Sequence, residues 1–253
     1  MLSKNKIKFI NSLKLKKFRD EYKLFIDEGD KLVKDLISGG YLIQEIYCTQ
    51  KWLQNYPISR NILLNEINEE ELSRISQLST PNQVLAIASY QEKSINYDKI
   101  FQNLSLMLDE IKDPGNLGTI IRIADWFGIS DIICSENSVD IYNPKVVQST
   151  MGSIARVKVH YTNLADFLKK CPDNIPVYGT VLDGNNIYEQ DLSKNGIIIV
   201  GNESRGISEN LLQYITNKLL IPSYAQNLEN KAESLNASVA TAIVCAEFKR
   251  KFN

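Results

Sequence analysis

Residues 104–250 alternate between short apolar runs and segments of helical pattern, and this alternation limits the fold more than any other feature of the sequence. Apolar runs such as LSLML at 104–108 and GIIIV at 196–200 are typical of strands that are buried on both faces. Helical segments separate these runs and are suited to cross back over a sheet. The alternation therefore predicts an α/β fold with a mostly parallel sheet that helices cover on both sides.

The same pattern predicts the individual elements of this second half. We expect strands at 104–110, 131–136, 158–162, 177–182, 196–203 and 218–224. We expect helices at 119–127, 143–157, 164–171, 207–215 and 234–252.

The first ninety residues show a second, shorter alternation. A helical pattern runs from Lys14 to the glycine pair at 39–40. Strands are predicted at 42–49, 61–67 and 84–90, with helices at 49–56 and 69–78. The polar stretch 91–99 has few apolar residues and is typical of a linker. These features predict a small α/β domain at 1–95 and a larger α/β domain at 96–253.

The residue inventory excludes several kinds of chemistry. His160 is the only histidine, so zinc sites built on two or three histidines are excluded, and we expect no metal site. The four cysteines are widely scattered, which favours reduced thiols in a reducing compartment. No apolar run is long enough for a membrane span, and the first residues do not resemble a secretory signal. We therefore expect a cytoplasmic protein.

Positive charge is concentrated at the amino terminus. Residues 1–23 contain two acidic residues and eight basic ones, a net charge of +6, whereas the whole chain carries −1. The basic residues are Lys4, Lys6, Lys8, Lys14, Lys16, Lys17, Arg19 and Lys23. Such asymmetry is typical of a nucleic-acid contact, although a solvated helix face gives the same pattern.

Three segments place small and polar residues directly after predicted strands. They are DPGNLG at 113–118, GNESRG at 201–206, and a third that begins at Ile221-Pro222 and ends at SLN, 234–236. Ligands bind beyond the carboxyl ends of parallel strands, so the three segments are candidates for one site. Each alone also suits a tight turn or a helix cap. The first lacks GxGxxG spacing, which argues against a nicotinamide-dependent oxidoreductase.

Taken together and in this order, the three segments resemble the motifs of the TrmH/SpoU family of RNA ribose 2′-O-methyltransferases, in the SPOUT class. The matching residues are Asn116, Gly118 and Arg122, then Gly201, Asn202, Glu203 and Gly206, then Ile221, Pro222 and 234–240. The resemblance covers about residues 104–250. The stretches 25–40 and 79–89 resemble the substrate-binding domain of that family, which is similar to RNA-binding ribosomal proteins.

The resemblance implies a deep trefoil knot in the domain at 96–253, with S-adenosylmethionine bent inside it. Backbone groups of Gly201, Ile221 and Leu235 would hold this cofactor, and Thr180 and Val181 would line its pocket. Apolar side chains can enclose the flat adenine ring while main-chain groups bind its polar edges.

The resemblance also implies that Asn116 and Arg122 lie at the reacting ribose, with Glu203, Ser234 and Asn236 nearby. Arg122 is the proton acceptor that the family suggests, but a guanidinium is a poor base. The alternative is that Arg122 binds the neighbouring phosphate while Glu203 or a water molecule accepts the proton.

Two positions depart from the family pattern. The segment 223–233 is longer than usual and has no glycine, so no cofactor contact is assigned to it. Ala237 stands where valine is usual.

We therefore expect an S-adenosylmethionine-dependent methyltransferase that acts on ribosomal or transfer RNA. The alternative is an RNA-binding module that has lost catalysis. We also expect a homodimer formed through the carboxyl-terminal domain, with contacts from the last helix at Val239, Ile243, Val244 and Phe248. The alternative for these four residues is that they form internal core.

Overall fold

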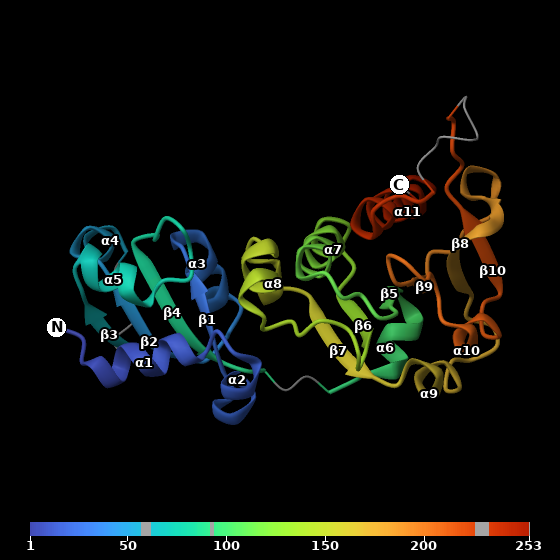
Figure 1. Cartoon of the computed structure of the whole chain (residues 1–253). Helices are drawn as coiled ribbons and strands as arrows, with labels where there is room; N and C mark the ends of the chain where they lie inside the picture. The colour runs from blue at the N-terminus through green and yellow to red at the C-terminus, as the bar shows by residue number, and fades with distance from the viewer. Residues whose placement is uncertain (57–61, 92–93, 226–232, 253) are drawn as a thin grey trace. The chain divides into compact units, whose positions relative to one another are not determined.

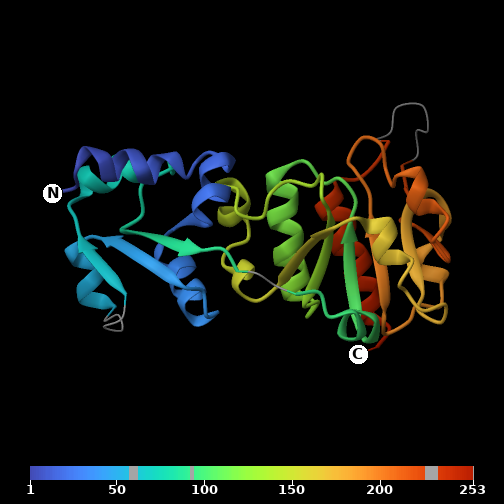
Figure 2. The same cartoon turned by 90° about the horizontal axis from the view of Figure 1, so that it is seen from below.

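The chain folds into two compact units, shown in Figure 1 and Figure 2 for a computed structural model that describes residues 1–56, 62–91, 94–225 and 233–252. The first unit comprises residues 1–92 and 140–156. The second comprises residues 93–139 and 157–253. Among the described residues, no helix is both long and apolar enough to cross a membrane.

The second unit is built on a six-stranded sheet in which every pair of neighbouring strands is parallel. The strand order is β10-β8-β9-β5-β6-β7. The bounds are β5 Leu104–Leu108, β6 Asp131–Ser135, β7 Lys158–Thr162, β8 Val177–Asn186, β9 Gly196–Val200 and β10 Asn217–Leu220. The predicted parallel α/β sheet is confirmed.

Helices cover both faces of this sheet (Figure 1). One face carries α6 (Tyr97–Gln102), α9 (Leu164–Leu168) and α10 (Glu209–Leu212), which share one apolar cluster with the strands. The other face carries α7 (Pro114–Trp126) and α11 (Ala237–Arg250), which pack against each other. A short 3-10 helix, η2, spans Ile187–Glu189. Buried strand residues alternate between the two faces, so each face has its own core.

The first unit contains a four-stranded mixed sheet in the order β1-β4-β2-β3. Its strands are β1 Leu24–Glu28, β2 Ile43–Cys48, β3 Leu63–Glu66 and β4 Val84–Ser89. Its first five helices are α1 Lys4–Ser12, α2 Lys16–Tyr22, α3 Asp30–Ser38, α4 Gln50–Asn55 and α5 Glu69–Ile75. Figure 2 shows α1 and α5 on one side of the sheet and α3 and α4 on the other.

The helix predicted from Lys14 to residue 39 is wrong. Strand β1 interrupts it and pairs antiparallel with β4, burying Phe25 and Ile26. Lys23, with φ of 54°, ends α2, and Gly29, with φ of 110°, separates β1 from α3. Apolar residues of two short helices and the strand between them fall three and four positions apart. A count of apolar spacing therefore cannot distinguish the strand from the helices.

Residues 140–156, here called the returning segment, leave the second unit after β6, pack on the first unit, and lead back into β7. The segment contains α8 (Pro144–Ser149), which packs on β1, and the 3-10 helix η1 (Ser153–Ala155). The helix predicted at 143–157 therefore ends early. Left-handed Met151 (φ 51°) and Gly152 (φ 89°) follow it. The predicted domain boundary between residues 95 and 96 stays a prediction.

Specific contacts hold the returning segment on the first unit. The Arg19 guanidinium is 2% exposed and donates to Asp140 Oδ2 at 2.8 Å. The rings of Tyr90 and Tyr142 stack with centroids 3.9 Å apart. Arg19 is therefore part of the packing of this unit, and it cannot serve as the surface RNA contact that its place in the basic stretch suggested.

Candidate active site

The predicted site residues come from the segments that follow β5, β9 and β10 and from within β8. The loop after β5 leads into α7, the loop after β9 forms the turn 201–206, and the chain after β10 leads to α11. Because α7 and α11 pack side by side, their amino-terminal ends bring the first and third of these segments together. The sheet thus gathers motifs that lie up to 120 residues apart in the sequence.

Three of the predicted residues form one chain of hydrogen bonds. Asn116 donates through Nδ2 to Glu203 Oε1 at 2.8 Å. Asn236 donates through Nδ2 to Asn116 Oδ1 at 2.9 Å. Each of these residues belongs to a different segment, so the chain Glu203–Asn116–Asn236 ties all three motifs into one site.

Helix capping fixes the amides of this chain in place. Asp113, the N-cap of α7, accepts from the backbone N–H of Asn116 at 2.7 Å. Asn236, the N-cap of α11, uses Oδ1 to accept from the backbone N–H and the hydroxyl of Ser238, at 2.9 and 2.6 Å. The Oδ1 of Asn236 already accepts from Ser238, so Asn236 has only its Nδ2 to offer Asn116. An ionised carboxylate only accepts hydrogen bonds, so each amide can point in one direction only. Asn116 therefore turns its donor to Glu203.

The turn 201–206 presents Glu203 to Asn116. Asn202 and Gly206 exchange two backbone hydrogen bonds of 2.9 Å, and Gly206 has φ of 72°. The side chain of Asn202 accepts from the backbone N–H groups of Ser204 and Arg205, at 3.0 and 3.1 Å. At Gly201 an added Cβ would lie 2.2 Å from the carbonyl carbon of Gly206. Only glycine fits at 201.

Arg122 lies apart from this hydrogen-bonded chain. It stands six residues after Asn116 in α7, about 9 Å along the helix axis and about a third of a turn away around it. Its side chain is exposed, and it makes no hydrogen bond or ion pair within the described part of the chain. The guanidinium is therefore accessible to an anionic group from outside.

Thr180 and Val181 lie where β8 leaves the ladder with β10. Gly179 pairs with Lys218, but the next pair is Asn185 with Leu219, so residues 180–184 bulge out of the ladder. Both Thr180 and Val181 are half-buried, and Thr180 Oγ1 donates to the Ile199 carbonyl at 3.0 Å. They thus stand at the same edge of the sheet as Gly201 and Ile221.

The remaining predicted cofactor contacts suit S-adenosylmethionine. The side chain of Leu235 is 48% exposed, and Ile221 is half-buried. Within the described residues, the N–H and C=O groups of Leu235 make no hydrogen bond to other backbone groups. An exposed apolar side chain beside free main-chain groups is what an adenine ring requires. Ser234 is exposed, and most of the long segment 223–233, at 226–232, lies outside the described residues.

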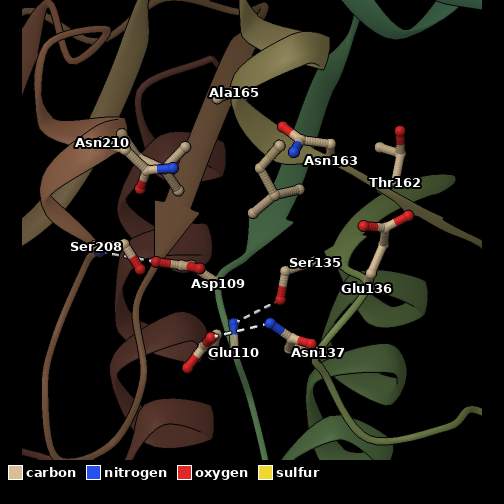
Figure 3. Close-up of a pocket in the computed structure, with 12 residues that line it drawn as sticks. Asp109, Glu110, Ser135, Glu136, Asn137, Thr162, Asn163, Ala165, Ser208 and Asn210 are labelled. Carbon is tan, nitrogen blue, oxygen red and sulfur yellow. Dashed lines mark hydrogen bonds between the residues drawn. The ribbon is translucent and has the colours of Figure 1, made fainter.

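A pocket lies at the carboxyl ends of β5, β6 and β7, and none of the ten predicted site residues lines it (Figure 3). The pocket has a volume of about 230 Å³ and is lined by carboxylate, amide and hydroxyl groups. They come mainly from the sequences directly after these strands and from the starts of α9 and α10: Asp109, Glu110, Ser135, Glu136, Asn137, Thr162, Asn163, Ser208 and Asn210. The polar runs DE and SEN at the ends of the two predicted strands are the signal that could have indicated it.

Comparison with known families assigns most of the chain. Residues 103–246 match the SpoU rRNA Methylase family. Residues 4–86 match the MRM3-like substrate binding domain. The first match spans more than half of the chain and includes all the predicted site residues.

Individual relatives match all or nearly all of the chain. The 23S rRNA (guanosine(2553)-2'-O)-methyltransferase RlmP of Bacillus subtilis is 31% identical over 242 residues, covering 94% of each chain. A putative RNA methyltransferase of the TrmH family from Porphyromonas gingivalis has a TM-score of 0.90 at 37% identity, covering 99% of each chain. An AdoMet-bound rRNA methyltransferase from Sinorhizobium meliloti has a TM-score of 0.87 at 30% identity, covering 100% of this chain and 97% of that one. This chain belongs to the SpoU rRNA methylase family.

Proposed function

We propose that this enzyme transfers a methyl group from S-adenosylmethionine to a ribose 2′-hydroxyl of ribosomal RNA. The relatives from B. subtilis and S. meliloti are named as rRNA methyltransferases, which supports ribosomal rather than transfer RNA as the substrate. The observation that carries the catalytic assignment is the hydrogen-bonded chain Glu203–Asn116–Asn236, because a module without catalysis has no need of it.

S-adenosylmethionine, when bound, supplies a methyl group already activated by its positively charged sulfonium. We assign the cofactor to the loops at Gly201, Ile221 and Leu235, with Thr180 and Val181 at its side. With an activated donor, the main task of the protein is to orient the 2′-oxygen and to remove its proton.

We assign proton removal to Glu203 and phosphate binding to Arg122. Oε1 of Glu203 accepts from Asn116, and Oε2 makes no hydrogen bond to the described residues, so Oε2 has lone pairs for the 2′-hydroxyl proton. The 2′-hydroxyl would give its proton to this oxygen as its own oxygen forms the new O–C bond, and the C–S bond of the sulfonium would break to leave a neutral thioether. Arg122, whose guanidinium presents planar donors that suit a phosphate, would bind the neighbouring phosphate. Ser234 and Asn236 would border the ribose.

We assign RNA binding to the first unit. Exposed lysines on α1 and α2, among them Lys4, Lys8 and Lys17, make no ion pair within the described residues and are available to phosphates. Lys6 is less available, because it pairs with Glu45 at 2.9 Å. Such contacts give affinity without sequence preference.

Three further features belong to this proposal: the trefoil knot in the second unit, a cytoplasmic location where ribosomal RNA is made, and a homodimer.

Val244 and Phe248 are buried within their own subunit, so they cannot supply the dimer contact expected of them. Val239, 48% exposed, and Trp126, 84% exposed, are apolar groups of α11 and α7 that a partner could cover. Light scattering of the purified protein measures the dimer directly.

The proposed reaction is tested in a strain that lacks this protein. Ribosomal RNA and transfer RNA are digested separately, and 2′-O-methylated nucleosides are quantified by mass spectrometry. We expect one methylated nucleoside to decrease in ribosomal RNA and to return when the wild-type protein is supplied. A decrease confined to transfer RNA would refute the substrate assignment, and unchanged levels in both would refute the reaction.

A further inference from the structure

Glu110, the second residue after β5, has a backbone conformation that its residue type disfavours. Its φ is 52°, in the left-handed region where a Cβ crowds the following carbonyl. Lys23 and Met151 are the other non-glycine residues with positive φ in the described part of the chain. Backbone strain of this kind persists only where surrounding contacts enforce it.

Every polar group of Glu110 has a partner. Its N–H donates to Ser135 Oγ at 2.8 Å, and Oε1 accepts from Asn137 Nδ2 at 3.3 Å (Figure 3). Its carbonyl accepts from Asn202 Nδ2 at 2.8 Å. Oε2 forms an ion pair with the guanidinium of Arg205. Glu110 therefore links the ends of β5 and β6 to the turn 201–206.

The two partners in that turn stand on either side of Glu203. Asn202 precedes it, Arg205 follows it by two residues, and both are anchored on Glu110. The carboxylate between them is the one that accepts from Asn116 at 2.8 Å. A shift of the turn away from Glu110 would move Glu203 relative to Asn116.

Stability does not account for a glutamate at this position. The side chain of Arg205 is 71% exposed, and ion pairs with such exposure contribute little to stability. Glycine would adopt the same φ without strain and would keep both backbone hydrogen bonds. Only the glutamate side chain adds the ion pair with Arg205 and the hydrogen bond from Asn137.

We propose that Glu110 is a positioning residue, which acts through Arg205 to hold the 201–206 turn where Glu203 meets Asn116. The proposal rests on the proposed function for its kinetic readout. In this role the Glu110–Arg205 pair orients a group that acts on the substrate, and neither member of the pair is assigned a contact with the substrate itself.

The test compares Glu110→Gly, Glu110→Gln and Arg205→Ala in single-turnover methyl transfer at saturating cofactor and RNA. Glu110→Gly should slow this step by about tenfold or more, since small misplacements of reacting groups have large effects on rate. Its melting temperature should be equal or higher because the strain is relieved. Glu110→Gln keeps an oxygen for the guanidinium and should retain most of the rate. Arg205→Ala should match Glu110→Gly, and the double variant should be no slower than either.

Met151→Gly is the matched control, because it relieves the same backbone strain outside the site and should leave the rate unchanged. Hydrogen exchange of amides 202–206, measured without substrate, should be faster in Glu110→Gly than in wild type. If wild type transfers no methyl group, the proposed function fails, and the exchange rates alone decide the positioning role. Unchanged rate and exchange in Glu110→Gly would overturn the proposal. So would weaker RNA binding in Arg205→Ala with an unaffected rate in Glu110→Gly, because Arg205 would then be an RNA contact.

Discussion

At the scale of single residues, Arg122 and Asn116 make different contributions because only one of them carries charge. Arg122→Ala should slow single-turnover methyl transfer by about 10² or more, the scale of a lost electrostatic group. Arg122→Lys should restore little, since an ammonium lacks the planar pair of donors that suits a phosphate. Cofactor affinity and melting temperature should stay near wild type, because the side chain is exposed and unpaired in the described structure.

Asn116→Ala is the companion variant, with a smaller expected loss of rate, because an amide orients Glu203 without compensating charge. A change of less than about twofold for Arg122→Ala would mean that Arg122 is a surface residue of α7 and takes no part in the reaction. Single-turnover measurement isolates the chemical step from RNA binding and product release.

Asp131 gives a residue-scale prediction about stability and pH. Burial disfavours its charge, but hydrogen bonds from His160 and Ser130, together with nearby Lys99, hold the pKa of Asp131 well below its usual value. A carboxyl with a lowered folded-state pKa stabilises the protein above its unfolded pKa of about 3.9. This stabilisation is lost progressively as the pH falls from that value through the lower folded-state pKa. Asp131→Asn should therefore lower the free energy of unfolding by about 2 kcal/mol near neutral pH.

Urea titrations of wild type and Asp131→Asn at several pH values measure this difference. The difference between the two proteins should begin to shrink as the pH falls below about 4, and it should keep shrinking toward the lowered folded-state pKa of Asp131. Asp166→Asn is the control, because its ion pair with Lys169 is exposed and should matter little at any pH. A constant difference between wild type and Asp131→Asn across the pH range would exclude the charge of Asp131 as its cause.

At the scale of helices and strands, the sequence predicted the second unit more accurately than the first. Its strands are short apolar runs bounded by glycine and polar residues, which is the clearest pattern a parallel sheet produces. In the first unit, β1 was missed because LFIDE continues the spacing of the neighbouring helices. Only its pairing with β4, sixty residues away, distinguishes it as a strand.

The candidate site was predictable as a set of residues but not as a geometry. The family resemblance pointed to Glu203, Asn116 and Asn236 as site residues. Which of them donates and which accepts depends on two helix caps, and the spacing of the sequence does not show these caps. Glu110 could not be singled out either, since the sequence does not show that its backbone has a left-handed conformation.

The turn 201–206 gives a prediction at this scale. In Gly201→Ala, the new methyl group would meet the backbone of Gly206 at 2.2 Å, so the turn must open. We expect a loss of about 1–3 kcal/mol in stability and at least a tenfold loss of cofactor affinity by calorimetry. Gly128→Ala is the matched control: it has φ of 65° but nothing within 4 Å of the added Cβ, so it should lose stability without losing affinity. Equal affinities in Gly201→Ala and wild type would contradict the cofactor assignment.

At the scale of the whole molecule, the chain passes between the two units three times, near residues 92, 139 and 156. The returning segment therefore depends on residues of the first unit for its packing. Deleting residues 1–95 would leave Tyr142 without Tyr90 and Asp140 without Arg19. Substitution of surface charges is a cleaner way to examine RNA binding by the first unit.

The triple variant Lys4→Gln, Lys8→Gln and Lys17→Gln should bind RNA more weakly with a shallower salt dependence. Each phosphate contact that is lost reduces the slope of log affinity against log salt by about 0.7–0.9, so three contacts reduce it by about two to three. Arg19 is left intact because it is buried, and its removal would disturb the returning segment.

A control with the same change in net charge separates the position of the lysines from the total charge of the protein. Lys31→Gln, Lys51→Gln and Lys158→Gln remove three exposed lysines that lie outside α1 and α2. If α1 and α2 contact phosphates, this control should keep nearly the wild-type salt slope, while cofactor affinity stays unchanged in both triple variants. Equal slopes in the two triple variants would mean that RNA responds only to overall charge, and the basic stretch at 1–23 would then be a solvated helix face.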